Sequence, residues 1–379
     1  MGLKTMINID IISRSYYSYS GENPTIGGVQ TYLTYLSEFL TSNGYRVSII
    51  QRGEADFIRK SVHATVIGLT TKSLKPKKLI KELYFKRCAT RKNGERYITI
   101  IASDQVIPDV KIPNSIVIQH GISWDMIDES KTPFAFAFLK KVIIAYQLIH
   151  SLSNIENVVC VDYNYVNWYR SLESQRKVKL SVIPNFTAIP KCQIKPENGA
   201  VKIIFARRLV NYRGTRLFGE VAKRLSQEYG ERVDITIAGE GPDKVWMEEK
   251  LNGCENVHFI TYTSEESLTI HADKHIAVVP TTGSEGTSLS LLEAMSAHCA
   301  VVCTNVGGMT NIVLDHYNGL MINPEEGELY DALTTLIRDK AIRNQLADKA
   351  YETAAGSFSL NLWQERWLKV VKEVEQKYH

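Results

Sequence analysis

The chain has 379 residues, more than one hydrophobic core usually organises, so we expect two domains. Hydrophobic residues make up 44% and charged residues 23%, as in ordinary soluble globular proteins, and the net charge is a mild +4. The six cysteines form no CxxC pair, which excludes a cysteine-based metal site and fits a reducing cytoplasm.

The first residues, MGLKTMINIDIIS, carry one lysine and no sustained apolar stretch, so we expect no signal peptide. A helix is expected over 29–43, because Leu33, Leu36 and Leu40 fall on one face and Gly44 can cap its end. The β-rich runs of this half are MINIDII, YRVSII, HATVIGL, YITIIAS, SIVIQH and NVVCV. Runs of this kind that alternate with helical patterns predict βαβ units and a parallel sheet.

Two candidate ligand-binding features follow strands of this first half. Gly27 and Gly28, in IGGVQ, would let the backbone approach a ligand because they lack a Cβ atom, although in isolation the pair reads as an ordinary tight turn. It is not the dinucleotide fingerprint, which needs GxGxxG. His120 ends the run SIVIQH, where its side chain would point into a cleft between the domains; a lone histidine is more often structural.

Positive charge is concentrated in residues 72–96, which hold ten Lys/Arg against two Glu and suggest a surface for something acidic. An apolar helical stripe bordered by cations is typical of a helix in an anionic membrane interface. An ordinary surface helix that packs this stripe on the sheet fits the same pattern. The stripe is Leu79, Ile80, Leu83 and Tyr84, and the candidate membrane or acceptor patch is Lys75, Lys77, Lys78, Lys81, Lys86 and Arg87.

The most apolar segment, 134–149, reads FAFAFLKKVIIAYQLI. It is too short to span a bilayer and carries Lys140 and Lys141 in its middle. We therefore expect a buried or interfacial helix.

Residues 184–200 have three prolines, a glycine and little periodicity, so we expect them to link the two domains. Alternation restarts after them with VKIIFAR, VDITIAG, NVHFIT, HIAVVP and AVVCT, and helices are expected over 215–229 and 288–297. This predicts a second doubly wound domain. A last helix, roughly 362–376, has Trp363 and Trp367 at helical spacing and is expected to pack back on the first domain.

The segment 280–308, PTTGSEGTSLSLLEAMSAHCAVVCTNVGG, places a polar glycine-bearing loop between a strand and a helix. The unpaired first-turn amides of that helix and its dipole favour an anion. Glu285 in the loop and Glu293 in the helix can face one cavity, while the amides between them face a diphosphate. Carboxylates beside an anion site suit the hydroxyls of a sugar and a ribose. An ordinary acidic helix N-terminus is the alternative reading.

A second anion-friendly segment is FARRLVNYRG, where Arg207, Arg208 and Arg213 follow a strand. Open α/β sheets bind ligands at this carboxyl edge, and guanidinium groups bind phosphate oxygens in pairs. Alone, three arginines in a loop are more often a solvated surface. No DxD occurs in the sequence, so we expect no carboxylate-held divalent metal.

The segment EGTSLSLLEAM resembles the Glu-x7-Glu motif of glycosyltransferase family 4, a large retaining family with the GT-B fold. Other motifs follow in the family's linear order: GGVQTY, QHG, VIPNF, RRLVNYRG, AGEGPD, the paired glutamates, NVGG and the Asn-Gly of 318–319. The resemblance covers nearly the whole chain and points to the bacterial polysaccharide and glycolipid assembly type.

The resemblance implies that Glu293 holds the ribose of the donor nucleotide, that Glu285 lies at the transferred sugar, and that His120 lies near the sugar's C6 side. Arg208 and Arg213 would bind the diphosphate. The other donor-binding residues would be Gly27, Gly28, Gly241, Gly286, Thr287, Ser288 and Leu289. The chain departs from the family pattern, which leaves the donor sugar open, at Arg213 in place of lysine, Arg207 and His298 in place of glycine, and Asn311 in place of an acidic residue.

We therefore expect an α/β protein of the GT-B type, with two Rossmann-like doubly wound parallel-sheet domains that face a central cleft. Residues 1–185, with the helix 360–379 packed back on them, would form the acceptor-side domain, and 186–359 the donor-binding domain. The expected function is retaining, metal-independent transfer of a sugar from a nucleoside diphosphate sugar to a hydroxyl, with no cofactor.

Expected partners are the donor, a glycan or lipid-linked glycan acceptor and an anionic membrane surface, with no nucleic acid. The expected location is the cytoplasm or the inner face of the cell membrane, and the expected role is cell-surface polysaccharide or lipopolysaccharide biosynthesis. Front-side attack and a double displacement through Glu285 both stay open. A non-catalytic nucleotide-sugar-binding protein and a sugar-nucleotide epimerase of similar fold are the alternatives.

Overall fold

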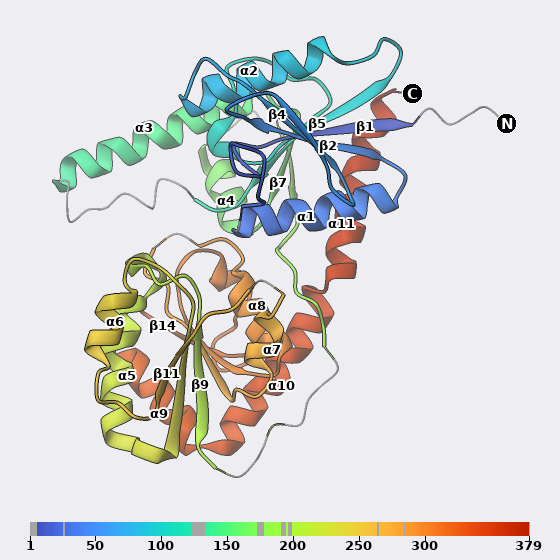
Figure 1. Ribbon diagram of the computed structural model, residues 1–379. Helices are drawn as coiled ribbons and strands as arrows, with labels where there is room; N and C mark the ends of the chain where they lie inside the picture. The colour runs from blue at the N-terminus through green and yellow to red at the C-terminus, as the bar shows by residue number, and fades with distance from the viewer. Residues whose placement is uncertain are drawn as a thin grey trace. The chain divides into compact units, whose positions relative to one another are not determined.

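The computed structural model describes residues 6–25, 27–122, 133–172, 178–190, 195, 199–263, 265–283 and 285–378. Ile26, Cys192 and part of the expected linker 184–200 lie outside these residues. The chain forms two compact units (Figure 1). Unit 1 is Met1–Ile183 with Gln364–His379, and unit 2 is Pro184–Trp363. That the two face a central cleft stays a prediction.

Unit 1 is built on an eight-stranded sheet in the order β3-β4-β2-β1-β5-β6-β7-β8. Its neighbouring strands are parallel except for the pair β3 and β4. All six expected strands are present, and β3 and β8 are additional. The strands are β1 (Ile7–Ile12), β2 (Arg46–Arg52), β3 (Phe57–Lys60), β4 (Thr65–Leu69), β5 (Arg96–Ile101), β6 (Ser115–Gln119), β7 (Asn157–Cys160) and β8 (Lys179–Val182).

The helices of unit 1 cover this sheet, and α1 buries Leu33, Leu36 and Leu40 as the sequence pattern predicts. At the other end of the chain, the buried Trp367 of α11 donates a hydrogen bond from Nε1 to the Tyr32 hydroxyl of α1 at 2.7 Å. The helices are α1 (Gly28–Ser42), α2 (Pro76–Ala89), α3 (Phe134–Leu152), α4 (Tyr163–Leu172) and α11 (Leu360–Glu375), with a short 3-10 turn η1 (Asp104–Val106) after β5.

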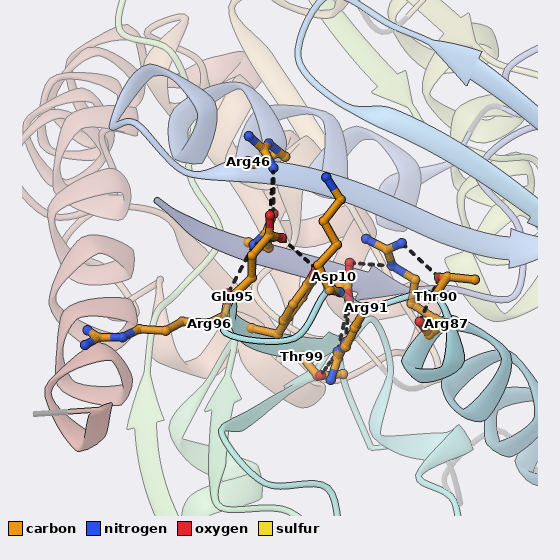
Figure 2. Close-up of polar contacts among 11 residues, drawn as sticks. Asp10, Arg46, Arg87, Thr90, Arg91, Glu95, Arg96 and Thr99 are labelled. Atoms are coloured by element: carbon orange, nitrogen blue, oxygen red, sulfur yellow. Dashed lines mark hydrogen bonds and ion pairs between the residues drawn. The ribbon is translucent and has the colours of Figure 1, made fainter. Parts of the chain in front are cut away.

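A buried carboxylate ties α2 to the centre of this sheet (Figure 2). Asp10 of β1 is fully buried, and its two oxygens accept from Arg87 Nε at 2.9 Å and Arg91 Nε at 3.0 Å. Arg91 also donates to the Thr99 hydroxyl at 2.8 Å. Because a carboxylate in the interior needs charged partners, these two arginines are part of the fold.

Unit 2 has a six-stranded sheet in the order β11-β10-β9-β12-β13-β14, with all paired strands parallel. Separate apolar clusters lie on its two faces, because a parallel sheet is covered by helices on both sides. The strands are β9 (Val201–Ala206), β10 (Val233–Ala238), β11 (Val257–Ile260), β12 (Ile276–Val279), β13 (Ala300–Thr304) and β14 (Leu320–Ile322). The helices are α5 (Thr215–Tyr229), α6 (Lys244–Lys250), α7 (Ser267–His271), α8 (Leu289–Ser296), α9 (Glu326–Arg338) and α10 (Lys340–Ser357). The predicted class, two doubly wound parallel-sheet domains, is confirmed.

Candidate active site

The predicted residues of unit 2 gather at the point where the strand order reverses. The chain runs outward from β9 to β10 and β11 and then returns to β12 on the other side of β9. Side chains after β9 and after β12 therefore meet at one edge, the position where open α/β sheets bind ligands. Arg207 follows β9, and Thr281 and Glu285 follow β12.

Glu285 is held there by three donors that converge on one oxygen, Oε2. Arg207 Nη2 lies at 2.8 Å, the Thr281 hydroxyl at 3.1 Å, and Arg213 forms an ion pair through Nη1. Arg207 also donates from Nη1 to the Thr281 hydroxyl at 2.6 Å. Because all three donors bind Oε2, the carboxylate has a fixed orientation and no contact with the described residues is seen at Oε1.

Arg207 is the functional candidate that sequence reasoning missed. The sequence marks it only as a departure from a common glycine, whereas its side chain is almost fully buried against Glu285. Burial lowers the pKa of Arg207 to about 10, still above neutral pH. Burial, followed by the neighbouring charge of Arg207, lowers the pKa of Arg213 to about 10 as well. Both guanidinium groups are therefore cationic at neutral pH.

Arg208, the expected diphosphate ligand, behaves differently from its neighbour. It is exposed and makes no salt bridge to the part of the chain that the structure describes. Two arginines against Glu285 already leave an excess of one positive charge, and Arg208 adds another next to it. The loop after β9 is therefore locally cationic, as an anion site requires.

The glycine-bearing loop before α8 is fixed by close backbone packing. A Cβ at Gly308 would lie 2.5 Å from the Gly286 carbonyl carbon, and the Gly308 amide donates to the Glu285 carbonyl at 2.8 Å. Asn185 donates from Nδ2 to the Thr287 carbonyl at 2.6 Å. Ser288 is the N-cap residue of α8, which begins at Leu289. Gly286, Thr287, Ser288 and Leu289 thus form one segment at a helix N-terminus, as predicted.

Glu293 lies in the second turn of α8, and its Oε2 accepts from the Ser267 hydroxyl at 2.5 Å. Burial raises the pKa of Glu293 to about 7, and the Ser267 hydrogen bond only partly opposes this. Gly241 lies in the loop after β10, where a Cβ would be 2.2 Å from the Leu209 carbonyl oxygen. The glycine thus allows two strand-end loops to pack tightly beside Arg208.

The predicted residues of unit 1 lie at one end of its sheet. Gly27 precedes α1 and Gly28 opens it, and a Cβ added to Gly28 would meet no atom within 4 Å. His120 follows β6, contacts Tyr32 of α1 edge-on at 5.2 Å, and bonds through Nε2 to the Ala102 carbonyl at 2.9 Å. Burial lowers the pKa of His120 to about 4, so the ring is neutral. A carbonyl only accepts, so Nε2 carries the proton and Nδ1 is the acceptor.

The predicted interfacial stripe on α2 is wrong. Leu79, Ile80, Leu83 and Tyr84 are buried in the core of unit 1, because α2 packs this face on the sheet as an ordinary surface helix does. Four of the six patch cations are also engaged within the unit: Lys77 with Ser151, Lys81 with Asp109, Lys86 with Thr70 and Arg87 with Asp10. The side chains of Lys75 and Lys78 alone make neither a hydrogen bond nor a salt bridge to the described residues.

Among the described residues, no group of three or more His, Cys, Asp or Glu side chains is placed to hold a metal ion.

Comparison with known proteins places this geometry in a recognised class. The structure aligns with sucrose-phosphate synthase from Thermosynechococcus elongatus at a TM-score of 0.75, with 16% identity, over 98% of this chain and 99% of that one. It aligns with Anabaena Alr3699/HepE in complex with UDP-glucose at 0.71, with 14% identity, over 97% and 99% of the two chains. These likenesses establish the GT-B fold.

The sequence comparisons name the family of the second unit. Residues 200–339 match the family described as glycosyl transferases group 1, so unit 2 carries a domain of that family. One relative, from the human phosphatidylinositol N-acetylglucosaminyltransferase, is 23% identical over 81% of this chain. The aligned region spans 63% of that relative's length.

Proposed function

We propose that the chain is a retaining glycosyltransferase of family 4. It transfers a sugar from a nucleoside diphosphate sugar to a hydroxyl of a glycan or lipid-linked glycan, at the cytoplasmic side of the cell membrane, in surface polysaccharide assembly. The observation that carries the proposal is the convergence of Arg207, Arg213 and Glu285 at the switch point, in front of the N-terminus of α8. The match to glycosyl transferases group 1 supports it.

In this reaction the acceptor oxygen forms a bond to the anomeric carbon while the bond from that carbon to the diphosphate oxygen breaks. Negative charge grows on the leaving diphosphate. Arg208, Arg213 and the amides at the start of α8 would stabilise this charge, which is usually the largest catalytic contribution in such sites. Glu293 would bind the ribose, and its pKa near neutrality suits a hydrogen bond to a hydroxyl group.

The contacts of Glu285 favour front-side attack over a double displacement. A carboxylate whose Oε2 is bound by two guanidinium groups is a weaker nucleophile than a free one. In front-side attack the acceptor proton passes to the departing phosphate oxygen, and no enzyme nucleophile is needed. Glu285 would then orient the sugar and stabilise the positive charge that develops at its anomeric carbon.

The direct test screens UDP, GDP, dTDP and ADP sugars by thermal shift and then follows donor consumption by mass spectrometry. We expect one donor class to stabilise the protein and to be transferred or slowly hydrolysed, with retained anomeric configuration by NMR. Turnover should survive EDTA, since arginines and a helix N-terminus supply the positive charge. Loss restored by magnesium or manganese would show that a metal stabilises the leaving group. Binding without turnover would indicate a binding protein, and an epimerised donor an epimerase.

The diphosphate contacts give a second prediction. Arg208→Ala and Arg213→Ala should each weaken binding of the nucleoside diphosphate at least about tenfold and that of the free nucleoside less than about twofold, because each removes a charge directed at phosphate. Calorimetry with both ligands measures this. Arg216→Ala is the matched control, since Arg216 of α5 pairs with Asp243 at 3.2 Å away from Glu285. Equal losses for nucleotide and nucleoside would show that the arginines do not bind phosphate.

A further inference from the structure

The helix α3 carries a large apolar face that points away from the core of unit 1. Six of its apolar side chains are 45% to 69% exposed: Phe136, Phe138, Leu139, Val142, Ile143 and Tyr146. At 3.6 residues per turn they span about 160° of the helix circumference. A continuous apolar surface of this width is uncommon on a soluble monomer and marks an interaction site.

The inner face of α3 already supplies the contacts that hold the helix on the unit. Ala137, Leu148 and Leu152 are buried, and Leu148 and Leu152 belong to the core cluster beneath them. A surface helix of a globular protein normally pairs such a face with a polar one. Here the opposite side is apolar too, so the fold of unit 1 does not account for it.

The surroundings of this face are cationic. The helix has no Asp or Glu and carries Lys140 and Lys141. The neighbouring α2 carries five cations against one glutamate, and its Lys77 donates to the Ser151 hydroxyl of α3 at 2.7 Å, so the two helices lie side by side (Figure 1). The exposed Lys75 and Lys78 lie at the start of α2.

We propose that the outward face of α3 docks unit 1 on an anionic lipid bilayer, with the helix lying in the headgroup region. Exposed Phe, Leu and Ile side chains would enter the acyl boundary while Lys140 and the exposed lysines of α2 meet lipid phosphates. A second copy of the chain would bring the same cations together and be repelled, whereas anionic lipid neutralises them. This surface is independent of the transferase site and of its proposed activity.

One described helix, Ala135–Leu152 within α3, is long and apolar enough to cross a membrane by length and composition, with a mean hydropathy of 1.3. Two central lysines and an inner face packed on the core of unit 1 oppose a spanning arrangement. A helix in the plane of the interface satisfies both features, because its buried side stays on the protein and its apolar side meets lipid.

The experiment is co-sedimentation of the full chain with vesicles of equal parts phosphatidylcholine and phosphatidylglycerol. The wild type should bind at low salt, bind less as salt rises, and bind pure phosphatidylcholine at least about tenfold more weakly. Leu139→Gln/Ile143→Gln should lower binding to the anionic vesicles at least about tenfold, because it removes apolar surface from the docking face. Lys78→Glu/Lys140→Glu should also lower it, and that loss should shrink in high salt.

Ile58→Gln/Val62→Gln is the matched control, since both residues are at least as exposed but lie at the β3 edge of the sheet. It should bind vesicles like the wild type, and all variants should keep the far-UV circular dichroism and nucleotide binding of the wild type. The proposal is overturned if the wild type ignores anionic vesicles, or if the α3 variant binds like the control. It is also overturned if light scattering shows a dimer that only the α3 variant loses.

Discussion

Replacing Glu285 with glutamine lowers the turnover number at least about tenfold, which corresponds to roughly 1.4 kcal/mol of transition-state stabilisation. The substitution keeps the shape of the side chain but removes the charge that Arg207 and Arg213 bind. An amide also offers less stabilisation to positive charge at the anomeric carbon. The measurement is kcat and KM with the donor found by the screen, on protein whose thermal unfolding matches that of the wild type.

Glu220→Gln is the matched control for this change. Glu220 of α5 also pairs with a cation, Lys250, at 2.5 Å, but it lies outside the switch point. It should leave kcat within about twofold of the wild type, since a surface ion pair contributes little. A well-folded Glu285→Gln enzyme with unchanged kcat would remove Glu285 from the mechanism.

Replacing Asp10 with alanine lowers the free energy of unfolding of unit 1 by about 3–5 kcal/mol. The fully buried carboxylate accepts from Arg87 and Arg91 (Figure 2), and its loss leaves both guanidinium groups largely buried without their counterion. Denaturant unfolding of the full chain measures the change, followed by a probe confined to unit 1. Asp10→Asn should lie between the wild type and alanine, because it keeps size and some hydrogen bonding.

The control for Asp10 is Arg46→Ala, also in the region shown in Figure 2. Arg46 is 55% exposed and lies 3.8 Å from Glu95, so its removal should cost less than about 1 kcal/mol. If Asp10→Ala and Arg46→Ala cost the same, the buried cluster does not contribute to the stability of unit 1.

The fold class could be predicted because strands of parallel sheets are buried on both faces and appear as continuous apolar runs, such as INIDII in β1. The strand β3, FIRK, could not, because it is short, polar and mostly exposed at the sheet edge. For α2, an amphipathic pattern fits a sheet and a membrane equally, and only the three-dimensional contacts distinguish them.

The site shows a similar division. The motifs mark Glu285, Glu293 and the loop before α8 by spacing alone, and their roles stay predictions. Arg207 could not be separated from Arg208 by charge, because adjacent residues at a strand end point in opposite directions. One is buried against Glu285 and the other is exposed. The available signal was the unusual arginine where glycine is common.

The division of the chain within α11 has a consequence for how the protein is synthesised. Trp363 closes unit 2 and packs on Phe186, whereas Trp367, one helical turn later, belongs to unit 1 and bonds to Tyr32. Unit 1 is therefore translated first but completed last. Until the final helix has left the ribosome, Tyr32 lacks its tryptophan partner, so a nascent chain that ends after Ile183 is an unfinished domain. Expression of residues 1–183 alone should give an aggregation-prone product, and appending 364–379 through a flexible linker should restore its solubility.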